Sequence, residues 1–276
     1  MKATNTPYLL LFYFLLPAFS SLAQEKWTLL TTIDVGNAQH ISSDSYNNIY
    51  IADADGIVSQ YDSLGRKITF FSPGKKSKIT SLDGSRNVNI FLFYKNFQEF
   101  KLLNRFLTEI STTKISNNQV AFASLGTMSP DNALWIVDEG DLSLKKINLK
   151  FNQIIVNSSL LPVLPRSKNE FVFTHLKEYN NNLYLSDKEN GIFVFDNLGN
   201  YKTLIQAPGV DYFDFRDNYL YFLDGTKLTL LNLTNGQIQI PEKEFLQKTK
   251  IIFTSQKCYI LNQDQLTIFE HNILGK

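Results

Sequence analysis

Cysteine is almost absent from this chain, whose 276 residues contain only Cys258. A single cysteine cannot form a disulfide within the chain. Cys258 stands in the strand-like run Lys257-Cys258-Tyr259-Ile260. That context predicts a buried structural thiol and not a nucleophile.

Histidine is scarce as well, with only His40, His175 and His271. No His-Glu-x-x-His segment and no paired cysteines are present, so the usual spacings of zinc ligands are missing. The chain also lacks a Gly-x-Ser-x-Gly nucleophile elbow and a phosphate-binding glycine loop. His40 and His175 precede strand-like segments and could both face one channel. We interpret them as ordinary packed or surface residues, and His271 as solvated. The motifs thus predict no catalytic residue, no cofactor and no metal site.

Net charge is nearly zero, because 27 basic residues face 26 acidic ones and leave a formal charge of +1. Nucleic-acid binders carry a clustered basic surface, so we predict no nucleic-acid partner. The densest basic runs are Lys75 with Lys76 and Lys78, Lys145 with Lys146, and Lys248 with Lys250. We interpret each run as a solvated turn.

Long apolar runs are missing after residue 24, and spanning a bilayer takes about 20 apolar residues. The one apolar run, residues 8–16, has nine residues and follows Lys2. Ser21-Leu22-Ala23 then places small residues at the first and third positions. This layout predicts a secretory signal peptide, residues 1–23, cleaved after Ala23. We therefore expect one exported domain, residues 24–276, in the periplasm or associated with the outer membrane, with no transmembrane segment of its own.

Short runs of β-branched and aromatic residues dominate the rest of the chain, and one of them recurs six times. Each copy centres on an aromatic residue: Tyr50, Phe91, Trp135, Tyr184, Tyr221 and Tyr259. The spacing between successive copies averages about 42 residues, which is the length of one four-stranded propeller blade. The sequence predicts an all-β, six-bladed β-propeller.

A turn repeats with the strands. Asp62-Ser63-Leu64-Gly65 follows Tyr50 at the same distance along the chain at which Asp196-Asn197-Leu198-Gly199 follows Tyr184. The last copy is too short for a fourth strand. We predict that residues 27–33 supply it by pairing with residues 266–269, which closes the ring and protects its sheet edges.

Two segments fit the repeat less well. In the second blade Phe97, Phe100, Leu103 and Leu107 also match a helical stripe, so strands and a helix both remain open there. Residues 160–170, which include Pro162 and Pro165, break the pattern. We interpret them as a loop that projects between blades three and four.

Residues 44–71 read DSYNNIYIADADGIVSQYDSLGRKITFF and resemble an NHL-type repeat, with a turn, an aromatic-rich strand ending in Ala-Asp, and a second strand before a Gly turn. Residues 179–205 are similar to a fair degree, whereas the other copies keep only the aromatic residue and the turn. The resemblance implies a six-bladed propeller related to lactone hydrolases, lyases and plain binding modules. Function therefore stays open at the level of the fold.

Acidic residues gather at the repeat turns: Asp53, Asp55, Asp138, Glu139, Asp141, Asp187, Glu189 and Asp224. Carboxylates from several blades could hold a metal ion in a central channel. We favour hairpin-turn roles instead, because the residues recur at the same place in each blade.

Asp62-Ser63-Leu64 also resembles the O-glycosylation acceptor motif of exported Bacteroidota proteins. The amino-acid composition, rich in Asn, Lys, Ile, Phe and Tyr, resembles that of proteins encoded by AT-rich genomes of that phylum.

These observations lead us to expect a non-enzymatic subunit that docks on a protein partner, since a propeller presents broad loop-lined faces. One concrete form is a periplasmic plug or accessory subunit of the type nine (type IX) protein-export translocon in the outer membrane. The rival hypotheses are a lactonase-like or lyase-like enzyme that uses channel acids with His40 or His175, and a propeller that binds carbohydrate or peptide.

Overall fold

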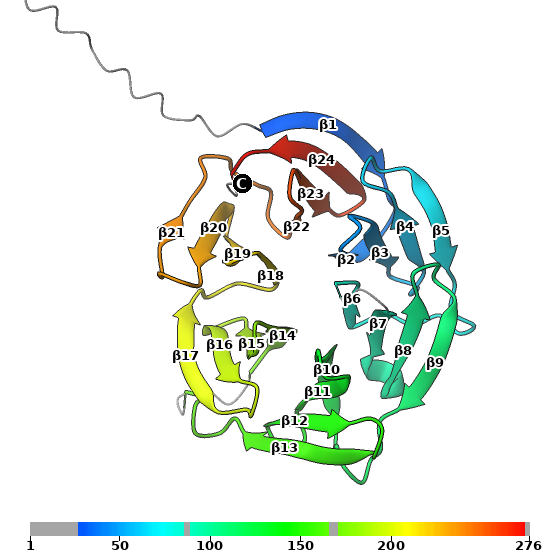
Figure 1. The fold of residues 1–276 in the computed structure, drawn as a ribbon, viewed down its shortest axis with the longest axis vertical. Coiled ribbons are helices and arrows are strands. Elements are labelled where there is room, and N and C mark those ends of the chain that lie inside the picture. The colour runs from blue at the N-terminus through cyan, green and yellow to red at the C-terminus, as the bar shows by residue number, and fades with distance from the viewer. Residues whose placement is uncertain (1–26, 86–88, 166–170, 274–276) are drawn as a thin grey trace, which may run out of the picture.

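Six four-stranded antiparallel sheets form a ring around a central axis (Figure 1). The computed structural model describes residues 27–85, 89–165 and 171–273. The predicted signal peptide, residues 1–23, lies outside the described residues. The predicted six-bladed, all-β propeller is confirmed.

The strands of each blade follow one another from the axis outward. Blade one contains β2 (Ala38–Ser43), β3 (Ile49–Asp53), β4 (Val58–Tyr61) and β5 (Lys67–Phe71). Blade two contains β6 (Ser81–Asp83), β7 (Asn89–Tyr94), β8 (Glu99–Asn104) and β9 (Glu109–Lys114). Blade three contains β10 (Ala123–Met128), β11 (Ala133–Asp138), β12 (Ser143–Asn148) and β13 (Gln153–Ser159).

The second half of the ring repeats this plan. Blade four contains β14 (Phe173–Tyr179), β15 (Asn182–Asp187), β16 (Gly191–Asp196) and β17 (Tyr201–Gln206). Blade five contains β18 (Phe213–Arg216), β19 (Tyr219–Asp224), β20 (Lys227–Asn232) and β21 (Ile238–Gln239). Blade six contains β22 (Lys250–Phe253), β23 (Lys257–Asn262) and β24 (Gln265–His271), and its outermost strand is β1 (Trp27–Asp34).

Strand β1 closes the ring from the other end of the chain, as predicted. It pairs antiparallel with β24, from Trp27 opposite His271 to Asp34 opposite Gln265. Figure 1 shows β1, in blue, along the outer side of β24, in red. The indole ring of Trp27 packs against Phe245, Phe253 and Phe269, with ring centroids 5.8, 6.2 and 5.9 Å apart.

The six recurring aromatic residues explain why the blades form a ring. Each is buried, and each belongs to a different hydrophobic cluster between its own blade and the next one. Tyr50 packs between blades one and two, and Tyr259 packs between blades six and one. Trp135 Nε1 also donates to Glu178 Oε2 of blade four at 2.8 Å. Burial of one large aromatic ring per interface therefore contributes to holding consecutive blades together.

The repeated turns share one hydrogen-bond pattern. Oδ1 of Asp62 accepts the backbone N–H groups of Leu64 and Arg66, both at 2.9 Å. Oδ1 of Asp196 accepts those of Leu198 and Asn200, at 2.8 and 2.9 Å. An Asx side chain that replaces backbone partners in this way is the ordinary reason for Asp and Asn at hairpins. Blade two has the same turn, built on Asn104.

The structure decides both ambiguous segments. In blade two Phe100 and Leu103 of the apolar stripe lie in β8, after a single 3-10 turn, η1 (Lys95–Phe97), that contains Phe97. Leu107 lies in the turn between β8 and β9, so the helical alternative is wrong. Residues 160–165, the described part of the predicted loop, connect blades three and four but do not project from the ring. Leu160 and Leu164 are buried in the cluster between these blades, which holds the segment against the core. Residues 166–170 lie outside the described part of the chain.

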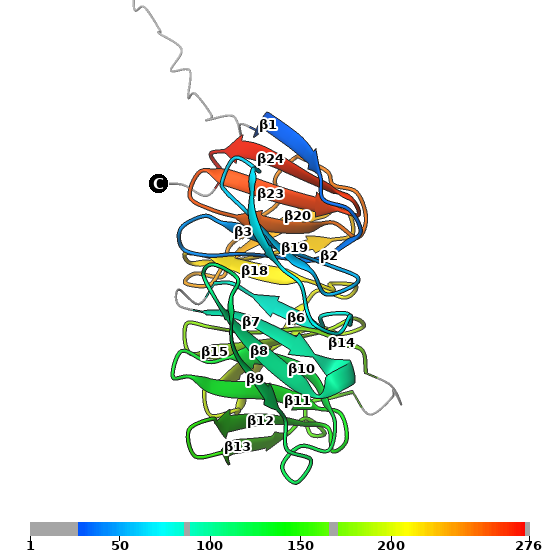
Figure 2. The same cartoon turned by 90° about the vertical axis from the view of Figure 1, so that its right-hand side faces the viewer.

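The blades end at two faces, which Figure 2 shows from the side. The connections between the first and second strands and between the third and fourth strands of a blade lie at one face, here called the tip face. The connections between the second and third strands, and those between blades, lie at the other, here called the lysine face. No helix of the described residues is long and apolar enough to cross a membrane.

Candidate functional site

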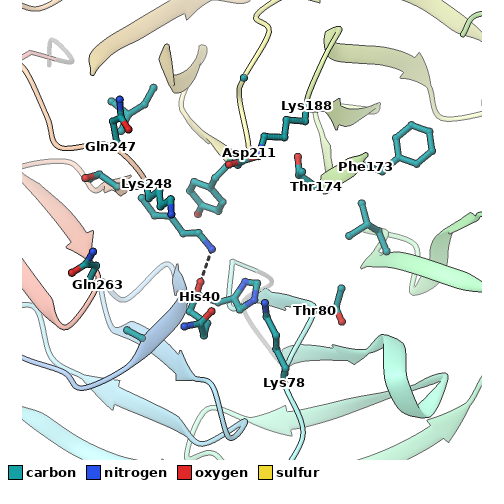
Figure 3. A pocket seen from close by; sticks show the side chains of 18 of the residues that line it. His40, Lys78, Thr80, Phe173, Thr174, Lys188, Asp211, Gln247, Lys248 and Gln263 are labelled. Atoms are coloured by element: carbon teal, nitrogen blue, oxygen red, sulfur yellow. Dashed lines mark hydrogen bonds and ion pairs between the residues drawn. The ribbon is translucent and has the colours of Figure 1, made fainter. Parts of the chain in front are cut away.

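The lysine face has a wide cavity at the mouth of the central channel (Figure 3), with a volume of about 960 Å³. All six blades contribute to its lining. The charged residues of the lining are Lys78, Lys95, Lys188, Lys248, Lys250 and Asp211, and His40 lies among them. Five lysines against one aspartate make this mouth strongly positive, although the whole chain carries a net charge of only +1.

His40 and His175 both face the channel, as the sequence analysis allowed. His40 lines the wide mouth, and His175 lines a much smaller cavity farther along the axis. Burial, followed by the charges of Lys250 and Lys78, holds the pKa of His40 well below its usual range. Burial, followed by the charge of Lys177, lowers the pKa of His175 to about 3. Both imidazoles are therefore neutral near pH 7.

The channel waist is occupied by charged groups from three inner strands. Nζ of Lys177 on β14 lies 2.6 Å from Oδ1 of Asp214 on β18 and 3.8 Å from Oδ1 of Asp83 on β6. The hydroxyl of Tyr212 donates to Oδ2 of Asp214 at 3.2 Å. The cavity beside them measures about 10 Å³, which is about the space of one water molecule. Sequence reasoning missed this group, since its three charged members, Asp83, Lys177 and Asp214, stand far apart in the chain and belong to different blades.

The acidic residues of the repeat turns bond mostly to their own turns. Asp53 Oδ1 accepts the backbone N–H groups of Asp55 and Ile57, both at 2.9 Å. Asp138 Oδ1 accepts the backbone N–H of Gly140 in its own turn at 2.9 Å. Asp138 also accepts the N–H groups of Ala121 and Phe122, which precede β10, and lies 2.6 Å from Nζ of Lys145. These contacts support the predicted turn roles. Among the described residues no group of three or more His, Cys, Asp and Glu side chains could hold a metal ion.

Several lysines differ from the sequence-based interpretation. Lys145 and Lys146 are not in a solvated turn: they lie in β12 and are buried, because Asp138 and Asp131 pair with them at 2.6 and 2.8 Å. Lys250 is half-buried in the channel mouth, where it donates to the Gln39 carbonyl at 2.5 Å.

The other basic residues agree better with that interpretation. Lys75, Lys76, Lys78 and Lys248 are exposed. Lys78 and Lys248 nonetheless join the lining of the mouth. Sequence reasoning missed this grouping because the two lysines lie in distant parts of the chain.

Cys258 and His271 have structural roles. Cys258 is fully buried, as predicted, and burial raises the pKa of its thiol well above its usual value. His271 is not solvated: it is half-buried, its ring packs edge-on against Phe253 at 4.9 Å, and its Nε2 lies 3.2 Å from the Thr254 carbonyl. Pairing of β24 with β1 places His271 next to Trp27 and so covers it.

The tip face exposes large apolar side chains at its turns. Leu64, Phe106, Phe151 and Leu198 belong to the third-to-fourth strand turns of blades one to four, and they are 53 %, 64 %, 62 % and 65 % exposed, respectively. Tyr46, in the first turn of blade one, is 67 % exposed. We call Leu64, Phe106, Phe151 and Leu198 the apolar tips.

No family model and no curated protein matches this chain.

Solved structures match it closely in fold. The WD40 domain of Neurospora crassa Pan2 is similar with a TM-score of 0.62 at 9 % identity, over 92 % of this chain and 97 % of that one. Virginiamycin B lyase from Staphylococcus aureus is similar with a TM-score of 0.61 at 13 % identity, over 89 % and 99 % of the two chains. The β-propeller domain of Cps50 (Swd1) from Myceliophteria thermophila has a TM-score of 0.63 at 12 % identity, over 89 % and 99 %.

Identities this low establish the propeller fold alone. The three neighbours include a WD40 domain and a lyase, so the fold is compatible with both binding and catalysis. The NHL resemblance and the expected export remain predictions. The choice between functions therefore depends on the side chains that this chain places on its two faces.

Proposed function

We propose that this chain is a non-enzymatic binding module that docks on a protein partner through its apolar tips. The observation that carries the proposal is the recurrence of an exposed Leu or Phe at the same kind of turn in four consecutive blades. Single exposed apolar residues are common on proteins. Here they recur at the same kind of turn in consecutive blades, and we take this series on one face as the interaction surface.

The turns themselves do not require apolar side chains. In each turn the backbone N–H of the tip residue donates to the Asx side chain: Leu64 to Asp62, Phe106 to Asn104, Phe151 to Asn148 and Leu198 to Asp196. The main chain alone thus satisfies the turn, and a polar residue would serve equally well at the tip. Folding does not explain the apolar choice, whereas docking does.

Basic groups beside the tips indicate the chemistry of the partner. The guanidinium of Arg105 lies over the Phe106 ring at 4.7 Å, and Nζ of Lys150 lies over the Phe151 ring at 5.4 Å. Arg66 is exposed beside Leu64, and its Nε pairs with Asp62 of the same turn at 2.6 Å. An apolar protein surface with acidic residues around it would complement this face, because charge complementarity steers and orients docking.

The expected export places such a partner in the periplasm or at the outer membrane. One form of the proposal is an accessory or plug subunit of the type IX protein-export translocon, where a ring-shaped disc would cover a pore. The expected export and the ring shape of the propeller support this form of the proposal.

Replacement of the four tips by serine (L64S/F106S/F151S/L198S) should abolish docking. Burial of a Leu or Phe side chain is worth roughly 1.5–3 kcal/mol, and about 1.4 kcal/mol changes affinity tenfold. Loss of four such contacts should therefore weaken the partner complex at least about a hundredfold. The partner is to be identified by cross-linking in native membranes and its Kd then measured with purified components.

The matched control is I110S/I155S, which removes two exposed apolar side chains from the outer strands β9 and β13. This variant should bind like the native protein. Equal binding of the partner by the tip variant and the native protein would refute the proposal, and so would the absence of any partner enriched over a tag-only control.

Catalysis by His40 and His175 is the rival function, and we expect the purified protein not to hydrolyse a panel of sugar lactones and esters. General acid–base chemistry needs unlike groups within hydrogen-bond reach of one substrate. The waist groups beside His175 are instead engaged with one another at a cavity of about 10 Å³, whereas His40 lines the separate wide mouth. The measurement is turnover by the native protein and by H40A/H175A, with metal content determined in parallel. Turnover that disappears in a folded double variant, or stoichiometric metal, would support an enzyme.

A further inference from the structure

We propose that the channel mouth on the lysine face binds a small anion that carries two or more carboxylate or phosphate groups, held between Lys78 and Lys250. This site lies at the opposite end of the channel from the apolar tips, so it is independent of protein docking.

The charge of the mouth is not balanced by the protein. Lys95 pairs with Glu139 at 3.1 Å, and Lys188 faces Asp211 at 3.9 Å. Within the described part of the chain, Lys78, Lys248 and Lys250 have no carboxylate within 4.0 Å. Convergent ammonium groups without counter-charge repel one another, so a bound anion would relieve that repulsion.

Lys250 is the lysine of the mouth whose pKa is lowered by its surroundings. It is half-buried, lies over the Tyr212 ring at 5.6 Å, and donates to the Gln39 carbonyl. Burial, followed by the charge of Lys78, lowers the pKa of Lys250 to about 8. A lysine that the fold holds partly desolvated beside a second lysine is poised to gain from an anionic ligand, because charge-assisted hydrogen bonds are strongest out of bulk water.

The rest of the lining suits a polar ligand. Neutral donors surround the lysines: Asn37, Gln39, Thr80, Asn96, Thr174, Gln247 and Thr249. His40, neutral beside Lys78 and Lys250, adds an imidazole N–H or an acceptor nitrogen. In Figure 3 Lys78 lies beside His40, and Lys188 and Lys248 lie on other sides of the mouth. Lining of this kind favours an oxyanion over an apolar molecule.

The cavity size favours a small molecule. Its volume of about 960 Å³ lies at the upper end of the roughly 300–1,000 Å³ typical of small-molecule sites. Carboxylates and phosphates share the relevant chemistry, namely oxygen atoms that accept from ammonium groups. Citrate and inorganic pyrophosphate are therefore the probes that distinguish the two sources.

Isothermal titration calorimetry of the purified protein with citrate and with pyrophosphate, at pH 7 in 150 mM NaCl (a chosen condition near physiological ionic strength), tests the site. We expect one site per chain for at least one probe, with binding weakened at least tenfold in K78Q/K250M. K78Q/K248Q replaces two exposed residues and serves as the second variant if the first does not fold. K114Q, which removes an exposed lysine at the end of β9, should bind like the native protein.

The pH dependence gives a separate readout. The titratable and charged groups that face Lys250 are Lys78, His40, His175, Asp211 and Tyr212. A bound anion stabilises protonated Lys250, so binding takes up a proton above pH 8, and affinity should fall by up to about tenfold per pH unit from there. K250M should lose this dependence.

Each outcome decides the proposal. Binding of citrate alone or of pyrophosphate alone assigns the carboxylate or the phosphate source, and binding of both supports a general oxyanion site. Absence of heat for both probes at 10 mM (a ceiling set by the roughly millimolar limit of weak specific binding) overturns the proposal. Binding that K78Q/K248Q retains in full also overturns it.

Discussion

A chain that lacks residues 24–35 should melt at least about 10 °C below the full-length protein. Strand β1 is the outermost strand of blade six, and its removal exposes the edge of β24 along seven residue pairs. It also removes Trp27 from the cluster of Phe245, Phe253 and Phe269. Loss of a packed Trp alone costs about 3–5 kcal/mol, and each kcal/mol lowers Tm by about 2–4 °C in a chain of this size.

Two controls separate ring closure from general damage. The L29S/L30S variant changes two exposed side chains of β1 and keeps its backbone pairing, so its Tm should stay close to native. A synthetic peptide of residues 24–35, added to the truncated chain, should restore much of the lost Tm in a concentration-dependent manner. A truncated chain that melts like the native one would show that β1 does not hold the ring closed.

Replacement of Lys177 by methionine should destabilise the protein by about 3–5 kcal/mol, the usual cost of removing one partner from a buried ion pair. Lys177, Asp214 and Asp83 are each 8–9 % exposed at the side chain and come from blades four, five and two. Methionine keeps the volume but removes the ammonium group that lies 2.6 Å from Asp214 and 3.8 Å from Asp83 in the channel waist. Urea denaturation at pH 7 measures the loss.

The control for this substitution is K76M. Lys76 also lies 2.6 Å from a carboxylate, that of Asp55, but both side chains are exposed. An exposed pair is screened by water, so K76M should leave the urea midpoint unchanged. A K177M protein as stable as K76M would mean that the waist network does not link the blades.

The sequence alone determined the architecture. Six aromatic residues at a regular, blade-length spacing predicted six blades, and the structure buries each of them in a different interface between blades. The short last repeat predicted that residues 27–33 would close the ring, and β1 does so. Both inferences succeed because blade length, turn chemistry and alternating burial are local properties that each repeat carries in its own residues.

Only the tertiary structure decided the rest. The apolar residues Phe97, Phe100, Leu103 and Leu107 are compatible with a helix as well as with strands. The pairing of β8 with β7 and β9 shows that this segment is built around a strand. Lys78 and Lys250 stand far apart in the sequence, yet the ring brings both to one mouth. The sequence predicts a solvated basic turn at Lys145, whereas in the structure this lysine pairs with Asp138. Two of these contacts depend on strand pairing within a blade and one depends on closure of the ring, and a pattern read along the chain contains neither kind of information.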